Sequence, residues 1–232
     1  MHRRGIEPLT TRFEAGYSIL LSYRCRKITD VNWNSKKMQT YRCEGIILHT
    51  LNFGDYDQIV TVFSFEIGLL KFIVKKGNST KHGLKNTPLT KAEFVYTQGK
   101  SELFKLKELS GLNHYLTLRK NLRHLDTACE CLRAIRASQM LHKPAPDLYG
   151  LLEAYLDRIP LIHNLPNLES SFKLKILRHE GILDMEEGFN HRDIPHIEQL
   201  AYAQSYGVLN TMIVEDRLHA EIKAFFTKTI AL

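Results

Sequence analysis

Seven lysines in the first half of the chain are the residues whose type and spacing indicate chemistry. They come from one predicted strand, the polar loop after it and one later strand: Lys71, Lys75, Lys76, Lys81, Lys85, Lys105 and Lys107. A lysine supplies a mobile positive charge that requires no fixed geometry, which suits contact with a phosphate backbone. If the two strands are neighbours, these lysines form a stripe for a polyanion. The alternative is an ordinary solvated surface.

The positive charge of the chain is concentrated towards its N-terminal half. The net formal charge is +7. Residues 1–37 hold eight Lys/Arg against three Asp/Glu, residues 38–118 hold ten against seven, and residues 119–232 hold fourteen against fifteen. This asymmetry indicates nucleic acid or an anionic membrane surface as the partner.

Short apolar runs predict the strands that position the lysines. The expected strands are residues 41–51, 57–63, 69–75, 92–97 and 102–109, with turns marked by Gly54, Gly68 and Gly99. In the third strand, alternation places Lys71 and Lys75 on the face opposite Phe72. Five short antiparallel strands in about seventy residues predict a small barrel of the OB type, which often binds single strands on a basic and aromatic face. Tyr56, Tyr96 and Phe104 are candidates for base stacking, although each also suits a core or a turn.

A three- and four-residue apolar period predicts an all-α second half. Helices are expected over about 122–140, 148–159, 167–179, 193–207 and 215–229. The chain therefore divides into a basic, poorly ordered extension at 1–37, an OB-fold nucleic-acid-binding domain at 38–118 and a helical domain for partner docking at 119–232. Met38, just before the first strand, is a plausible alternative initiator.

No sequence pattern indicates a catalytic residue, a cofactor site or a metal site. Gly99-Lys100-Ser101 is similar to the end of a phosphate-binding loop, but the upstream glycine spacing is absent. The four cysteines form no Cys-x-x-Cys pair, and Cys129 and Cys131 point to different faces of a predicted helix. No apolar run approaches the ~20 residues of a membrane span. We therefore expect a cytoplasmic protein with reduced thiols that is not an enzyme.

One stretch resembles a known family. Gly45-Ile46-Ile47-Leu48, followed by Phe53-Gly54-Asp55-Tyr56-Asp57-Gln58-Ile59-Val60, is similar to the opening of the bacterial recombination mediator RecO. The similarity continues through Gly68-Leu69-Leu70 and the basic turn of residues 75–81, and it includes Pro88 and Glu108-Leu109. It is specific over about residues 43–110 and architectural beyond them.

The resemblance implies an OB fold followed by a helical domain, binding to single- and double-stranded DNA, and strand annealing at the nucleoid. It also implies partnership with RecR and with the C-terminal tail of the single-strand binding protein, and thereby help in loading RecA. The DNA-contacting candidates that it implies are Lys71, Lys75, Lys76 and Lys81. Many RecO proteins hold a four-cysteine zinc site in the helical domain, but this chain has no cysteine after Cys131, so zinc is not expected.

Two other functional hypotheses stay open at this point. The first is an OB-fold RNA-binding or translation-associated protein, because a basic barrel face suits either nucleic acid. The second is a nucleic-acid enzyme whose site has no recognisable motif. A competition between DNA and RNA, and an assay for turnover, separate these hypotheses from a DNA-binding mediator.

Overall fold

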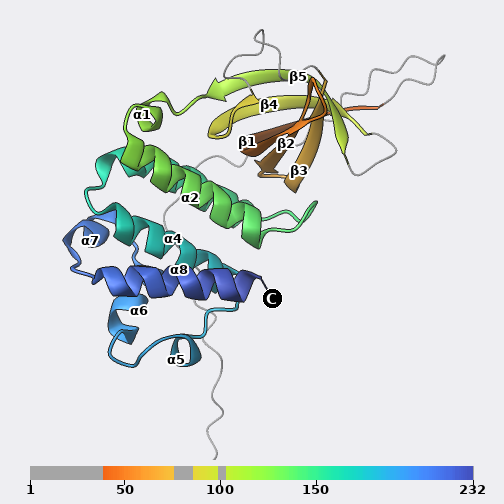
Figure 1. Ribbon diagram of the computed structural model, residues 1–232. Helices are drawn as coiled ribbons and strands as arrows, with labels where there is room; N and C mark the ends of the chain where they lie inside the picture. Colours follow the sequence, from red (N-terminus) through yellow and green to blue (C-terminus); the bar gives the residue numbers. More distant parts are fainter. Residues whose placement is uncertain (1–38, 76–85, 99–102, 232) are drawn as a thin grey trace, which may run out of the picture.

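The computed structural model describes residues 39–75, 86–98 and 103–231. The predicted N-terminal extension, Met38 and three of the candidate lysines, Lys76, Lys81 and Lys85, lie outside the described residues. Within the described chain, a β-barrel is followed by a helical half (Figure 1).

The first half is a closed five-stranded barrel, as the alternating sequence predicts. Its strands are β1 (Thr40–Phe53), β2 (Asp57–Ser64), β3 (Gly68–Val74), β4 (Thr90–Thr97) and β5 (Phe104–Asn113). They are ordered β1-β2-β3-β5-β4 around the barrel. All pairs are antiparallel except β3–β5, which is parallel. Five strands in a closed ring cannot all alternate in direction, so one neighbouring pair has to be parallel.

Aromatic rings fill the barrel interior. Phe72 stacks on Phe94 with ring centroids 5.3 Å apart, and Tyr96 lies 5.1 Å from Phe72 and 5.0 Å from Phe104. Contacts at these separations are favourable beyond the area that they bury. Of the three rings suggested for base stacking, Tyr96 therefore belongs to the barrel core, and Phe104 is half-buried and packs against that core.

The second half is helical. Its helices are α1 (Leu116–Arg119), α2 (Leu122–Ser138), α3 (Pro146–Arg158), the 3-10 turn η2 (Ile159–Leu161), α4 (Leu165–His179), α5 (Met185–Gly188), α6 (Ile194–Tyr202), α7 (Tyr206–Thr211) and α8 (Asp216–Ile230). Asn121 and Asn164 cap α2 and α4 by accepting bonds from backbone N–H groups. The helix predicted over 193–207 ends at Tyr202, because the backbone is no longer helical at Ala203 and is extended at Ser205, and a second helix, α7, begins at Tyr206. Among the described helices, none is long and apolar enough to cross a membrane.

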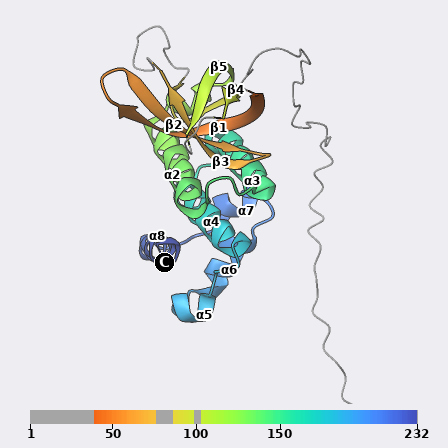
Figure 2. The same cartoon turned by 90° about the vertical axis from the view of Figure 1, so that its right-hand side faces the viewer.

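The outer side of the barrel shares a hydrophobic core with the helices, separate from the core inside the barrel. Ile46, Phe63 and Leu69 point out of the barrel and belong to the same buried cluster as α2, α3 and α4. The ring of Phe63 lies 5.8 Å from that of Tyr149 in α3. Figure 2 shows α2 and α3 directly beneath the barrel. The hydrophobic contacts therefore continue from the strands to the helices that follow Asn113.

Arg119 holds the segment before β4 against the helical half. Its guanidinium donates hydrogen bonds to the carbonyl oxygens of His114 (2.8 Å), Pro88 (2.6 Å) and Leu89 (2.9 Å). Burial lowers the pKa of Arg119, but several donors arranged in one plane still satisfy these carbonyls. This residue therefore fixes where the chain enters β4.

Candidate nucleic-acid interface

The strand register arranges the outer face of β1, β2 and β3 into rows of side chains. The row nearest the helices is Ile46–Phe63–Leu69, and the helices cover this row. The next is called the boundary row and consists of His49–Thr61–Lys71. The third is called the apolar row and consists of Leu51–Ile59–Ile73, with Lys105 of β5 paired beside Ile73. Rows two residues apart along a strand are about 6.6 Å apart.

The apolar row is exposed although it is hydrophobic. Leu51 is 54% exposed, and Ile59 and Ile73 are half-buried. Grouped exposed apolar side chains with a polar rim are typical of a binding surface. A flat apolar strip of this kind is suited to the faces of unstacked bases.

The turn between β1 and β2 extends the apolar row with two exposed aromatic rings. Phe53 is 53% exposed and Tyr56 is 71% exposed. Gly54 has φ +64°, a conformation that glycine adopts without strain and that makes the tight reversal possible. Of the three rings suggested for stacking, Tyr56 is the one available to solvent, and the sequence analysis did not single out Phe53.

The structure brings three of the predicted lysines to this face. Lys71 is half-buried in the boundary row, Lys75 follows the last residue of β3, and exposed Lys105 lies beside Ile73. We call these three the barrel lysines. Lys107 is exposed on β5 at a register shift, between Leu106 and Glu108, which pair with consecutive residues of β4. Among the described residues, β5 pairs with β3 only through Phe104 and Lys105, so Lys107 lies outside the rows.

Charge pairing separates this face from the opposite side of the barrel. On β1 and β4, Arg42 pairs with Glu93 at 3.2 Å, and Lys91 contacts Glu44 at 2.7 Å and Glu153 at 2.6 Å. Within the described chain, by contrast, the barrel lysines and Lys107 form no ion pair. Their charge is thus left available to an anionic partner.

The described part of the chain offers little for metal or covalent chemistry. It holds no group of three or more His, Cys, Asp or Glu side chains that could bind a metal ion. Burial raises the pKa of Cys129, and that of Cys131 still further, so both thiols are poor nucleophiles.

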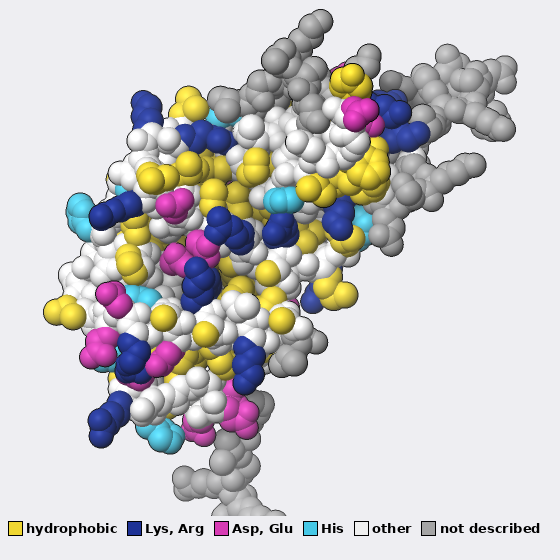
Figure 3. All heavy atoms as spheres, in the orientation of Figure 1, with side chains coloured by type: hydrophobic (Ala, Val, Ile, Leu, Met, Phe, Trp, Pro, Cys, Tyr) yellow, Lys and Arg dark blue, Asp and Glu magenta, His cyan; other side chains and the backbone are white. Residues whose placement is uncertain are grey.

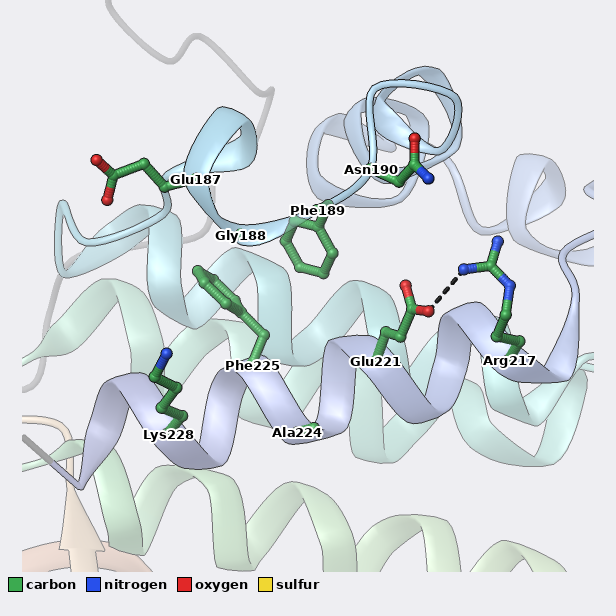
Figure 4. Close-up of a pocket in the computed structure, with 9 residues that line it drawn as sticks. All are labelled: Glu187, Gly188, Phe189, Asn190, Arg217, Glu221, Ala224, Phe225 and Lys228. Carbon is green, nitrogen blue, oxygen red and sulfur yellow. Dashed lines mark hydrogen bonds and ion pairs between the residues drawn. The ribbon is translucent and has the colours of Figure 1, made fainter.

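A cavity of about 480 Å³ lies far from the barrel, between the segment of α5 and α8 (Figure 4). Phe189 and Phe225 line it with ring centroids 4.7 Å apart. At one end, Arg217 is neutralised by Asp193 at 3.0 Å and Glu221 at 2.6 Å. These contacts hold α8 against the turn before α6, and the cavity is separate from the basic face of the barrel.

The fold and this face together define an OB-fold protein with an exposed basic and apolar surface. Residues 38–115 match the family model described as "Recombination protein O N terminal". Residues 38–115 are therefore similar to the N-terminal domain of RecO proteins, and the resemblance to RecO predicted from the sequence is confirmed.

Known relatives extend the similarity past the barrel. The chain is 29% identical over 143 residues to "DNA repair protein RecO" of Chlamydia pneumoniae, covering 61% of this chain and 56% of that protein. It is 31% identical over 144 residues to the protein of the same name from Chlamydia trachomatis serovar L2, covering 61% and 58%. It is 22% identical over 148 residues to the protein of the same name from Myxococcus xanthus, covering 63% of this chain and 61% of that protein. The chain thus spans a little more than half the length of these relatives.

Proposed function

We propose that this chain is a recombination mediator in DNA repair. In this proposal it binds single- and double-stranded DNA, promotes annealing of complementary strands and, with RecR and the single-strand binding protein, helps to load RecA. The relatives named DNA repair protein RecO support the repair role. The chain carries out no chemistry of its own in this mechanism, and it works in the cytoplasm on nucleoid DNA.

The observation that carries the proposal is the combination of an exposed apolar row with lysines that have no ion pair among the described residues. Lysines neutralise phosphates without reading sequence. Apolar and aromatic side chains contact the faces of bases and tolerate any sequence. A strand bound in this way keeps its hydrogen-bonding edges free, while its backbone charge is partly neutralised. Both conditions favour pairing with a second strand.

The proposal is tested by charge reversal on the face. In a Lys75→Glu/Lys105→Glu variant, we expect the affinity for single-stranded DNA to fall. The slope of log affinity against log salt should decrease by about 1.4, because each lost phosphate contact accounts for about 0.7. The matched control is Arg192→Glu/Lys228→Glu, which reverses two exposed charges near α6 and at the end of α8. Equal affinity and slope in the two variants would contradict the proposal.

The remaining candidate lysines belong to the same proposal. Lys76, Lys81 and Lys85 follow Lys75 in the sequence and Lys107 follows Lys105 on β5, so each is proposed to add phosphate contact. Charge reversal of Lys75, Lys76 and Lys81 together should lower the salt slope on duplex DNA by roughly one unit per lost contact, because each contact accounts for about 0.9 on a duplex. Unchanged binding would remove these residues from the interface.

The nucleic acid and the protein partners need separate experiments. Competition between single-stranded DNA and RNA of equal length should favour DNA, whereas clear RNA preference would support a translation-associated role. A pull-down of the single-strand binding protein, with and without its C-terminal tail, tests the proposed partner. Capture that requires the tail is the expected result.

A further inference from the structure

The loop between α2 and α3 occupies the edge of β3 that β5 leaves free. Among the described residues, β5 pairs with β3 only at Phe72 and Ile73. Before these residues, Leu141 forms a bridge with Leu69, and the N–H of His142 donates to the Leu69 carbonyl at 3.0 Å. The His142 ring lies 5.4 Å from the ring of Phe104 at the start of β5. The helical half therefore extends the barrel surface beside Lys71.

The loop brings a lysine to this edge. A Cβ atom on Gly68 would lie 1.9 Å from the Lys143 carbonyl oxygen, which shows how closely the two backbones approach. The Lys143 side chain is 60% exposed, and its one ion pair with a described carboxylate, that of Glu180, is long at 3.9 Å. An exposed pair at that distance contributes little, so the Lys143 charge is available.

The other end of the boundary row meets an arginine from α2. Burial, and to a lesser degree the charge of Arg136, lowers the pKa of His49. α2 packs against β1, which places Arg136 of that helix near His49 in the first position of the row. Arg136 is exposed and forms no ion pair with another described residue. By contrast Arg133, one turn earlier, is paired with Glu130.

These positions place cations at three points of the border between the barrel and the helical half. Arg136 lies near His49, Lys71 ends the boundary row, and Lys143 lies on the loop beside Gly68, at the start of β3. Figure 3 shows Lys, Arg and His side chains gathered along this border, next to exposed hydrophobic side chains of the barrel. The apolar row runs parallel to the cations, about 6.6 Å away.

We propose that Arg136 and Lys143 of the helical half bind the phosphates of a single strand whose bases lie on the apolar row. This inference rests on the proposed DNA-binding function. It adds the direction in which the DNA strand runs and a second contact surface, on the helical half. The strand follows the border, with its backbone against α2 and its bases towards Leu51, Ile59 and Ile73. A duplex keeps its bases stacked inside and cannot present their faces to the apolar row. The contribution of Arg136 and Lys143 should therefore be specific to single strands.

The test compares single-stranded and double-stranded DNA of the same length. The variant is Arg136→Gln/Lys143→Gln, and the matched control is Arg192→Gln/Lys228→Gln, which removes the same charge near α6 and at the end of α8, away from the border. Single-strand affinity of the first variant should fall about tenfold, and its salt slope by about 1.4, for two lost phosphate contacts. Duplex affinity should stay within about twofold of the control.

The outcomes separate this inference from the proposed function. If the wild-type protein does not bind DNA, or Lys75→Glu/Lys105→Glu has no effect, the proposed function fails. If that barrel variant binds DNA more weakly while Arg136→Gln/Lys143→Gln behaves like its control, the proposed function stands. The proposed course of the single strand along the border, the border path, is then wrong. An equal loss for single and double strands also overturns the border path. Thermal unfolding by circular dichroism checks that all variants fold.

Discussion

Replacement of Gly68 by alanine should separate the helical half from the barrel edge. Gly68 has φ +80°, where a side chain is disfavoured. Its added Cβ would lie 1.9 Å from the carbonyl oxygen of Lys143 and 2.6 Å from the carbonyl carbon. Both neighbours are backbone atoms, so the α2–α3 loop has to move away from β3.

The expected destabilisation follows from what that movement breaks. The left-handed conformation costs alanine about 1–2 kcal/mol. Loss of the 3.0 Å hydrogen bond from His142 to Leu69 costs about 1 kcal/mol more. Partial exposure of Leu141, which packs against the shared core, adds about 1 kcal/mol. The free energy of unfolding should therefore fall by about 3–4 kcal/mol.

Gly54→Ala is the matched control for this prediction. Gly54 also has a positive φ, +64°, but a Cβ there would meet nothing within 4 Å. Its substitution should cost only the conformational part, about 1–2 kcal/mol. Urea unfolding followed by far-ultraviolet circular dichroism measures both variants.

A Gly68→Ala variant no less stable than Gly54→Ala would refute the reasoning, because it would show that the loop does not lie against β3. Lys143 would then lose its defined position at the border. A large difference between the two variants supports the contact and the path built on it.

Two further predictions concern buried cations. Arg119→Lys should lower the free energy of unfolding by about 2–4 kcal/mol, because one ammonium group cannot reach the carbonyls of His114, Pro88 and Leu89 together. Urea unfolding measures this change, with Arg123→Lys at an exposed position as the control. An equal effect of the two substitutions would contradict the prediction. Burial, helped by Arg178, lowers the pKa of Lys175 to about 8, against about 10.4 in an unfolded chain. Between these pH values the unfolded state binds more protons, so stability relative to a Lys175→Met variant should rise with pH by up to about 1.4 kcal/mol per unit and stay level below pH 8. A difference that is flat from pH 7 to 10 would contradict the lowered pKa.

The sequence by itself determined the barrel, the helical half and the inward or outward direction of most strand residues. Alternation along β3 correctly separates Phe72 from Lys71, because side chains of a strand point to opposite faces. Gly54 and Gly68 mark real turns, since both adopt positive φ. These features depend on residues close together in the chain, so local pattern is enough to predict them.

Tertiary structure alone decided which residues share the candidate face. The register of β1 shifts between Ile47 and His49, and one extra residue reverses the faces of everything after it. Simple alternation from Ile47 would place His49 and Leu51 inside the barrel, whereas they lie in the boundary row and the apolar row. The parallel closure of β5 on β3 places Lys105 beside Ile73, and the α2–α3 loop places Lys143 beside Gly68. Such contacts join residues distant in the chain, and they form only when the strands and helices pack together.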